Sequence, residues 1–311
     1  MAVLKEAPTR RRVLTVDGFF DDAAGMRNVF DERLSDRRSS ARERFVWDYW
    51  HVPEQYTYVR TFADEFFPSD LYQRFLDRLL AWGREQLGCT AIVPPWLSYY
   101  VDGCGQELHA DVPHGQWAWV FSLTNWDERT WSGGETFLLG EQTLDFWRTL
   151  DERRGAELES FVELVESPFN RLTVFDPRIP HGVRRVYGTR DPLDSRIAVH
   201  GWFRDPGVVL SEAAEPARAA VEATLAMLLL SLRGVEGVEG IVATRIELSA
   251  DGSVADARVV SSSLVSTSGA ALEEAEQTIV EFLAASRFPA LSGDAWAVVP
   301  VTLPVAQPSA G

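Results

Sequence analysis

Two histidines and one aspartate have a spacing that suits a metal site. The tripeptide His109-Ala110-Asp111 places an imidazole and a carboxylate two residues apart, so on a strand both side chains would share one face. A single His-x-Asp is weak evidence in a chain with five histidines and 46 acidic residues. His181, within Pro180-His181-Gly182, offers a third donor 72 residues after His109. We predict that these three side chains bind one metal ion.

This donor set favours a particular metal chemistry. Two imidazoles and one carboxylate on one face of octahedral Fe(II) leave three positions open, enough for a chelating keto acid and dioxygen. Zn(II) also accepts such ligands, so a zinc hydrolase is an alternative. A nearby arginine favours the first interpretation, because a buried guanidinium needs a partner such as the distal carboxylate of a keto acid.

Arg196 is the preferred anchor and Arg190 the alternative. Asp191-Pro192 disfavours a strand interior, so residues 189–194 are predicted to form a turn that leaves Arg190 outside the following strand. Alternation along that strand places Arg196 on one face with three further residues, Ala198, His200 and Trp202. His200 is either a core histidine or a hydrogen-bonding group of the site, and Trp202 is expected to be a pocket wall.

The residues around these positions resemble those of a known enzyme family. The motifs are Tyr99 to Gly103, Gly105 to Asp111, Phe121 to Thr124, Gly133-Gly134-Glu135-Thr136-Phe137, Pro180 to Val183 and Arg196 to Phe203. Together they make the segment from about Trp96 to Phe203 similar to iron- and 2-oxoglutarate-dependent dioxygenases of the prolyl-hydroxylase-like branch. The resemblance implies a double-stranded β-helix core, also described as jelly-roll or cupin-like.

Carried over residue by residue, the resemblance implies specific roles. His109, Asp111 and His181 would be the iron ligands and Arg196 the anchor of 2-oxoglutarate, with Tyr100 as a second donor. Further candidates for cofactor binding are Thr136, His200, Trp202 and, as the alternative anchor, Arg190. Arg196 follows His181 by 15 residues, longer than the usual interval, whereas Arg190 follows it by nine.

The implied reaction consumes dioxygen and 2-oxoglutarate, releases succinate and carbon dioxide, and hydroxylates a C–H bond. Related halogenases lack the carboxylate ligand, so Asp111 favours hydroxylation. Three alternatives stay open beside a peptidyl or prolyl hydroxylase: a hydroxylase of a free amino acid or natural product, a metal-binding sensor without turnover, and the zinc hydrolase. His114 is expected to be solvated or to meet substrate, and His51 receives no role.

The pattern of the chain predicts an α+β protein with two domains. A helix is expected from Ser69 to Gly88, and short alternating strands are expected from Ile92 to Phe203. We predict a flexible leader at 1–12, an oxygenase domain at 13–207, a small α+β domain at 208–304 and a disordered tail at 305–311.

The small C-terminal domain resembles the C-terminal domain of TonB-like energy transducers. The similarity lies in Asp251 to Val254, Val259 to Ser263, Arg287 to Ala290 and Val299 to Val301. Its predicted elements are a helix from Ser211 to Leu232, a hairpin around Asp251-Gly252, a helix near Ala270 to Ala285 and a final strand. A sheet with a free edge can add an extended peptide, so this domain is expected to dock a peptide or protein substrate or to self-associate.

Composition narrows the classes of partner and compartment. A net charge of −16 disfavours nucleic acid, and the only basic run is Arg10 to Arg12. Two cysteines, Cys89 and Cys104, are too few for a disulfide framework and fit a reducing compartment. The longest apolar run, Leu225 to Leu230, is too short to span a bilayer, so a cytoplasmic protein without membrane attachment is expected. The oligomeric state is left open.

Overall fold

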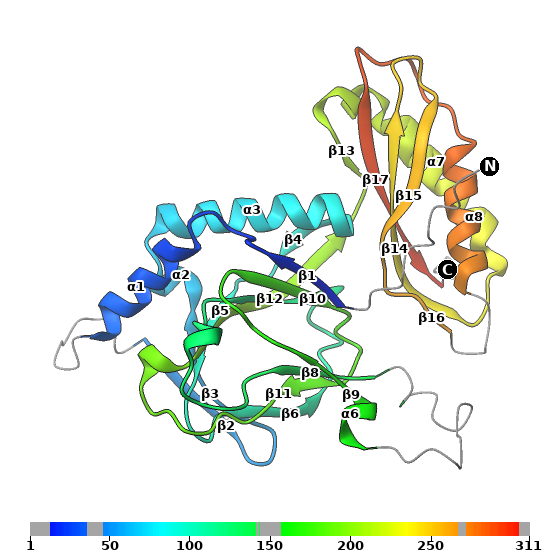
Figure 1. Cartoon of the computed structure of the whole chain (residues 1–311). Helices are drawn as coiled ribbons and strands as arrows, with labels where there is room; N and C mark the ends of the chain where they lie inside the picture. The colour runs from blue at the N-terminus through cyan, green and yellow to red at the C-terminus, as the bar shows by residue number, and fades with distance from the viewer. Residues whose placement is uncertain (1–12, 36–45, 141–142, 144–156, 267–271, 305–311) are drawn as a thin grey trace, which may run out of the picture. The chain divides into compact units, whose positions relative to one another are not determined.

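A computed structural model describes residues 13–35, 46–140, 143, 157–266 and 272–304 of the chain (Figure 1). The expected leader and tail lie outside these residues. The chain divides into two compact units. The first, here called the barrel unit, comprises Val13–Arg78 and Ile92–Phe203. The second, the C-terminal unit, comprises Leu79–Ala91 and the described residues from Arg204 onward.

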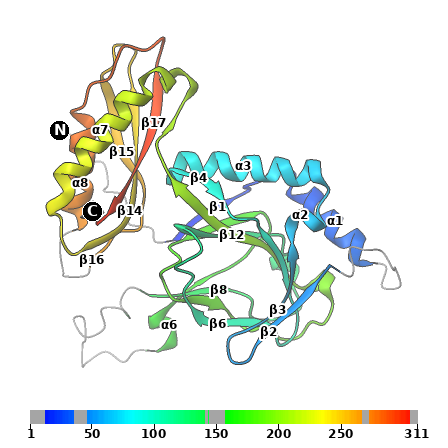
Figure 2. The ribbon, with the colours of Figure 1, turned by 180° about the vertical axis from the view of Figure 1, so that it is seen from behind.

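The larger of the two sheets is antiparallel and includes all the described strands of the barrel unit. Its strands are β1 (Val13–Asp17), β2 (Asp48–Val52), β3 (Tyr56–Phe62), β4 (Cys89–Ile92), β5 (Trp96–Tyr100), β6 (Gly105–His109), β7 (Trp117–Ser122), β8 (Thr136–Leu139), β9 (Val162–Val165), β10 (Arg171–Phe175), β11 (His181–Val183) and β12 (Arg196–Pro206). The main path runs β1-β10-β7-β12-β5-β3-β6-β11-β8-β9, while β2 pairs β3 and β4 pairs β12. The sheet curls on itself, as both views show (Figures 1 and 2). This is the double-stranded β-helix architecture that the family resemblance implies.

Helices cover the outer face of the curled sheet. They are α1 (Ala23–Ser35), α2 (Ala63–Phe66) and α3 (Ser69–Leu87), and shorter turns lie at η2 (Trp126–Glu128), α6 (Leu158–Phe161) and η3 (Pro192–Asp194). The predicted helix from Ser69 is confirmed as α3. Its Phe75 is fully buried, with its ring 5.6 Å from that of Phe20 and 4.9 Å from that of Phe121 in β7. Aromatic side chains thus pack α3 against the sheet.

The C-terminal unit is a smaller antiparallel sheet with helices. Its elements are β13 (Val209–Leu210), η4 (Glu212–Ala217), α7 (Arg218–Ser231), η5 (Leu232–Gly234), β14 (Val238–Leu248), β15 (Val254–Ser262), β16 (Val265–Ser266), α8 (Leu272–Ala284) and β17 (Ala295–Leu303). The strand order is β13-β17-β14-β15, and β16 pairs β14. The hairpin around Asp251-Gly252 is confirmed, since β14 and β15 pair on either side of it. Residues of α7 and α8, including Val221 and Ile279, share a buried core with this sheet.

One predicted helix of the C-terminal unit is interrupted. The sequence pattern predicted a continuous helix from Ser211 to Leu232, but the chain first forms the 3-10 turn η4 and only then α7. Pro216 lies inside η4. A proline has no backbone N–H and disfavours the α conformation at the residue before it, which explains the interruption.

Two further observations bear on the expectations from composition. Both cysteines are buried and free, so they form no disulfide. Within the described part of the chain, no helix combines the length and the apolar character that crossing a bilayer would require.

Candidate active site

Neighbouring strands present rows of side chains on the inner face of the sheet. β12 pairs β5 with Arg196 opposite Tyr100, and β5 pairs β3 with Ser98 opposite Arg60. Alternate residues of a strand share a face, so such cross-strand pairs line up in rows. The rows are Arg196–Tyr100–Tyr58, Ala198–Ser98–Arg60 and His200–Trp96–Phe62. A surface built in this way combines buried polar groups with large aromatic rings.

The two predicted histidine ligands form a cross-strand pair. β6 and β11 are antiparallel neighbours with His109 opposite His181, and the two ring centroids lie 4.5 Å apart. Gly182 permits this close approach, because a Cβ atom there would lie 2.4 Å from the carbonyl oxygen of Gln106. The Pro-His-Gly segment thereby lets β11 fit between β6 and β8.

Asp111 reaches the histidines from a loop. Because β6 ends at His109, the expectation that His109 and Asp111 lie on one strand is wrong. The backbone N–H of Asp111 donates to the carbonyl of Pro177 at 2.9 Å, and the N–H of His114 donates to the carbonyl of Asp111 at 3.0 Å. These two backbone hydrogen bonds hold Asp111 in place where none of the described strands pairs with it. The Asp111 carboxylate lies 3.7 Å from Nε2 of His109 and 3.5 Å from Nε2 of His181.

Backbone carbonyl groups orient both imidazoles. Nδ1 of His109 donates to the carbonyl of Glu107, and Nδ1 of His181 donates to the carbonyl of Ile179, each at 2.8 Å. A carbonyl oxygen only accepts hydrogen bonds, so Nδ1 carries the hydrogen and Nε2 is the ring nitrogen that would bind a metal. Two ligands about 2.1 Å from one ion lie at most about 4 Å apart, which suits the separations from Asp111. The three donors therefore fit a single transition-metal ion.

The ionisation of His109 and Asp111 suits a cation. Burial lowers the pKa of His109, so its imidazole is neutral near pH 7. Burial alone would raise the pKa of Asp111, but the imidazoles of His181 and His109 beside it lower that pKa below its usual value. Asp111 is therefore a carboxylate. A neutral imidazole at His109 and a carboxylate at Asp111 are the protonation states that metal binding requires of these two groups.

Arg196 is a buried cation with few partners. Its side chain is 2% exposed, its Cζ lies 4.7 Å from the centroid of the Tyr100 ring, and one terminal nitrogen donates to the hydroxyl of Thr136 at 3.3 Å. The Nε atom is buried and has no hydrogen-bond partner among the described residues. A buried guanidinium in this state is costly unless a carboxylate pairs with it. The distal carboxylate of 2-oxoglutarate fits this requirement.

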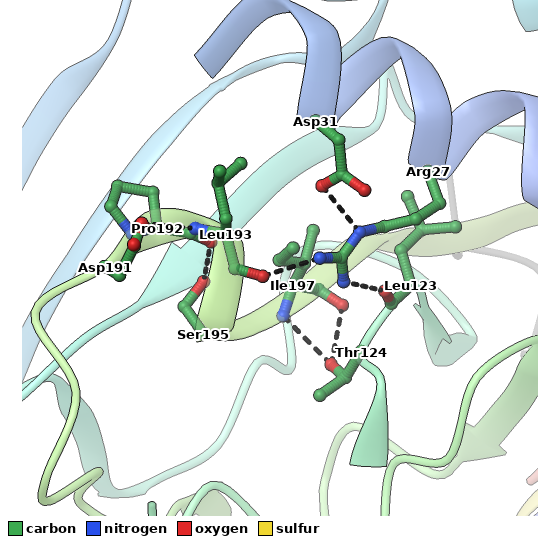
Figure 3. A network of polar contacts seen from close by, with 9 residues as sticks. All are labelled: Arg27, Asp31, Leu123, Thr124, Asp191, Pro192, Leu193, Ser195 and Ile197. Atoms are coloured by element: carbon green, nitrogen blue, oxygen red, sulfur yellow. Dashed lines mark hydrogen bonds and ion pairs between the residues drawn. The ribbon is translucent and has the colours of Figure 1, made fainter. Parts of the chain in front are cut away.

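A network of polar contacts holds the turn that leads into Arg196 (Figure 3). Arg27 of α1 donates to the carbonyl of Leu193 in η3 at 2.6 Å and to the carbonyl of Leu123 at 3.0 Å. The hydroxyl of Thr124 accepts from the N–H of Ile197 at 2.9 Å and donates to its carbonyl at 3.1 Å. The backbone on both sides of Arg196 is thus fixed by side chains distant in sequence.

His200 lies on the same face as Arg196, two positions further along the face. Its Nε2 is 2.7 Å from the hydroxyl of Ser98. Burial, with Arg196 as the next contribution, lowers the pKa of His200 to about 3. The imidazole is therefore neutral across the physiological range and serves as a hydrogen-bonding group of the pocket wall.

These groups line one cavity of about 510 Å³. The site residues at its wall are His109, Asp111, His181, Arg196, Tyr100, Thr136, His200 and Trp202. Ligand pockets of about 300 to 1,000 Å³ take drug-sized molecules, so 2-oxoglutarate and part of a second substrate fit together. His114 also lines the cavity, with its ring 4.6 Å from that of Trp202.

One candidate residue, Arg190, lies elsewhere, and some lining residues were not anticipated. Arg190 is exposed and does not line the cavity, and His51 is exposed on β2 with its Nδ1 2.9 Å from the Thr57 hydroxyl. Sequence reasoning missed a stripe on β3, which contributes Tyr56, Tyr58, Arg60 and Phe62. Its alternation of aromatic and basic residues in period two was the available signal.

The sequence matches no protein-family model and no curated protein. Solved structures do show similarity. A prolyl-4-hydroxylase from Pseudomonas putida is 16% identical, with a TM-score of 0.43 over 62% of this chain and 91% of that chain. An oxidoreductase of the 2OG-Fe(II) oxygenase family from Burkholderia pseudomallei is 13% identical, with a TM-score of 0.41 over 63% and 86%. The α-ketoglutarate-dependent epimerase SnoN from nogalamycin biosynthesis is 14% identical, with a TM-score of 0.42 over 64% and 80%.

Proposed function

We propose that this protein is an Fe(II)- and 2-oxoglutarate-dependent dioxygenase that hydroxylates a C–H bond. The observation that carries the proposal is one cavity lined by the three metal donors and by the under-paired guanidinium of Arg196. In a zinc hydrolase, the buried guanidinium of Arg196 would have no ligand to bind. A carboxylate at Asp111 favours hydroxylation over halogenation, because it fills the position that a halide would need.

Each group of the chain has a separate part in this function. His109, Asp111 and His181 would hold Fe(II), which supplies the activation of dioxygen while 2-oxoglutarate is converted to succinate and carbon dioxide. Arg196 would pair with the distal carboxylate of 2-oxoglutarate, and Thr136 would add a hydroxyl beside it. Tyr100 covers the guanidinium, and the aromatic walls exclude water from the reacting groups.

The direct test is anaerobic addition of 2-oxoglutarate to the Fe(II)-loaded protein. Chelation is expected to give a weak visible charge-transfer band, absent in His109→Ala and weakened in Arg196→Ala. A band weakened in Arg190→Ala instead would move the anchor to Arg190. An iron-loaded protein without any band would refute the oxygenase proposal and favour the sensor or hydrolase alternatives.

For the substrate, we propose a peptide or protein, with a prolyl residue as the first target. The supporting observation is the edge strand β15 of the C-terminal unit, which pairs with β14 and has no described strand on its other side. Such an edge can take up an extended peptide as an additional strand. The resemblance of this unit to TonB-type C-terminal domains is part of this proposal.

A free amino acid or natural product is the competing substrate class. The two classes are separated by succinate formation with capped proline-containing peptides and with free amino acids. A proline can be placed on β15 at a position whose N–H points away from β14. It would remove a donor that an added peptide strand needs, so it should lower the turnover of peptides and leave that of free amino acids unchanged. Turnover of free amino acids alone, unaffected by that proline, would reject the peptide proposal.

A further inference from the structure

A second arginine, Arg60, lies on the inner face of the barrel unit and has no part in the proposed cofactor site. It is the β3 residue opposite Ser98, in the row between that of Tyr58 and that of Phe62. Its side chain is 16% exposed and lines the same cavity as the metal donors. The strand register therefore places Arg60 on the cavity wall two strands away from β12.

Two indole rings lie against the Arg60 guanidinium. Its Cζ lies 3.9 Å from the ring centroid of Trp50 on β2 and 4.1 Å from that of Trp96 on β5. Stacking of this kind fixes the plane of the guanidinium and leaves the edge, where the N–H donors lie, for another group. The fork is thus held in one orientation before any ligand arrives, which lowers the entropic cost of binding.

The positive charge of Arg60 is poorly compensated by the protein. Its ion-pair partner among the described residues, Asp48, lies 3.6 Å away and is 57% exposed. An ion pair with one exposed partner at this distance is weak. The buried Nε of Arg60 has no hydrogen-bond partner in the described part of the chain. A carboxylate bound here would pair this charge as the proposed 2-oxoglutarate pairs Arg196.

The charges of the residues that line the cavity also favour a bound carboxylate at Arg60. Among the described lining residues, Asp111 is the only acidic one, and Arg60 and Arg196 are the two arginines. In the proposed function Asp111 belongs to the metal and Arg196 to 2-oxoglutarate. Arg60 is then the one arginine without an assigned function among the described residues that line the cavity. Trp50 and Phe62 beside it are 37% and 42% exposed, so apolar surface is available next to the cation.

We propose that Arg60 binds a carboxylate of the primary substrate, and that Trp50, Phe62 and Trp96 contact the apolar part of the same molecule. The assignment rests on the proposed oxygenase function and narrows its substrate class to carboxylates with an apolar body. Such a group is supplied either by a free carboxylic acid or by an acidic residue or C-terminus of a peptide. The two sources share the recognition chemistry and differ in what surrounds it.

The test measures binding and needs no turnover. The protein, loaded with Mn(II) and 2-oxoglutarate, is titrated with 3-phenylpropionate, indole-3-acetate, 4-methylpentanoate and N-acetyl-prolinate, each paired with its amide. A capped peptide with one glutamate, paired with its glutamine counterpart, forms the second arm. Carboxylates are expected to bind about 10- to 100-fold more tightly than the matched amides, and Arg60→Gln is expected to remove this difference. The arm that shows the larger difference identifies the source of the carboxylate.

Three variants make the result specific. Arg74→Gln removes an exposed arginine of α3 that pairs with Asp22 and Asp70, so it controls for net charge and is expected to change nothing. Asp48→Asn leaves Arg60 in place and removes its competing partner, so carboxylates should bind more tightly. Arg60→Lys keeps the charge but loses the planar fork, and an intermediate affinity is expected.

The outcomes separate this assignment from the proposed function. If 2-oxoglutarate itself fails to bind the wild-type protein, the oxygenase proposal fails before any acid is added. If 2-oxoglutarate binds normally but no carboxylate in either arm binds more tightly than its neutral counterpart, the Arg60 assignment is overturned. Equal binding by wild type and Arg60→Gln overturns it as well. Lower 2-oxoglutarate affinity in Arg60→Gln would reassign Arg60 to the cofactor.

Discussion

The guanidinium of Arg196 lies against the ring of Tyr100, with 4.7 Å between Cζ and the ring centroid, because β12 and β5 place these two residues opposite each other. Both side chains are almost fully buried. A cation in such a place is destabilising on its own and stabilising when a carboxylate joins it. This relationship links the stability of the fold to occupation of the site.

Replacing Arg196 by methionine should therefore separate stability from binding. Without 2-oxoglutarate, Arg196→Met is expected to be as stable as wild type or more stable, since a buried and under-paired charge is removed. The wild-type protein should gain about 2.7 kcal/mol at a ligand concentration 100 times its Kd, and the variant should gain nothing at that concentration. Urea unfolding with and without 2-oxoglutarate measures both effects. A variant that 2-oxoglutarate still stabilises fully would exclude Arg196 as the anchor.

The metal site gives a second prediction. His109→Ala and His181→Ala should each lower the affinity for Mn(II) or Fe(II) by at least about 10-fold, because second-shell changes alone cost that much. His51→Ala is the matched control, since His51 is exposed and its ring contacts Thr57 on the neighbouring strand. Titration with Mn(II), followed by the electron paramagnetic resonance signal of the free ion, reports the affinity. Comparable losses in all three variants would indicate nonspecific metal binding.

The burial of His200 predicts a pH dependence of stability. Its pKa is about 3 in the folded protein against an ordinary value of 6.5, so between these values the unfolded chain binds a proton that the folded chain does not. The free energy of unfolding should fall with falling pH across this window, by up to about 1.4 kcal/mol per pH unit from this residue. His200→Gln, whose amide can still bond to Ser98, should flatten the dependence between pH 6.5 and 4.5. Parallel urea-unfolding profiles for the two proteins would contradict it.

The contacts of Arg27 give a fourth prediction. Arg27→Leu leaves the carbonyls of Leu123 and Leu193 without their donor and should lower the free energy of unfolding by at least about 2 kcal/mol. Affinity for 2-oxoglutarate should fall too, since Leu193 belongs to the turn before Arg196. Asp31→Asn, which alters only a partner that is 40% exposed, should cost less than about 1 kcal/mol. Chemical denaturation and 2-oxoglutarate titration of both variants provide the comparison, and equal effects would show that the carbonyl contacts are unimportant.

The buried thiols give a fifth prediction. Burial raises the pKa of Cys89 to about 12 and raises that of Cys104, so neither is a thiolate near pH 8. Iodoacetamide should label them only as fast as the protein unfolds. Mass spectrometry after timed exposure, with and without urea, measures this. Rapid labelling of either cysteine in the native protein would reveal local opening.

Some features were predictable from sequence because they depend on local spacing. The helix from Ser69 and the Asp251-Gly252 hairpin follow from periodicity and turn chemistry. The loop position of Asp111 was not predictable, since it depends on the carbonyl of Pro177, 66 residues away. The role of Arg60 was hidden for a similar reason. The pairing of β3 with both β2 and β5 brings Trp50 and Trp96 close to its guanidinium.

The pairing of His109 with His181 has a consequence for the folding pathway. These residues are 72 positions apart, and Arg196 is 96 positions from Tyr100, so the site depends on contacts that are distant along the chain. Contacts of this range form slowly, because a long loop must close before they give any stabilisation. Metal affinity should therefore be negligible in early intermediates and develop as the sheet closes. In a refolding experiment, the time course of Mn(II) binding would therefore report the last stage of barrel assembly.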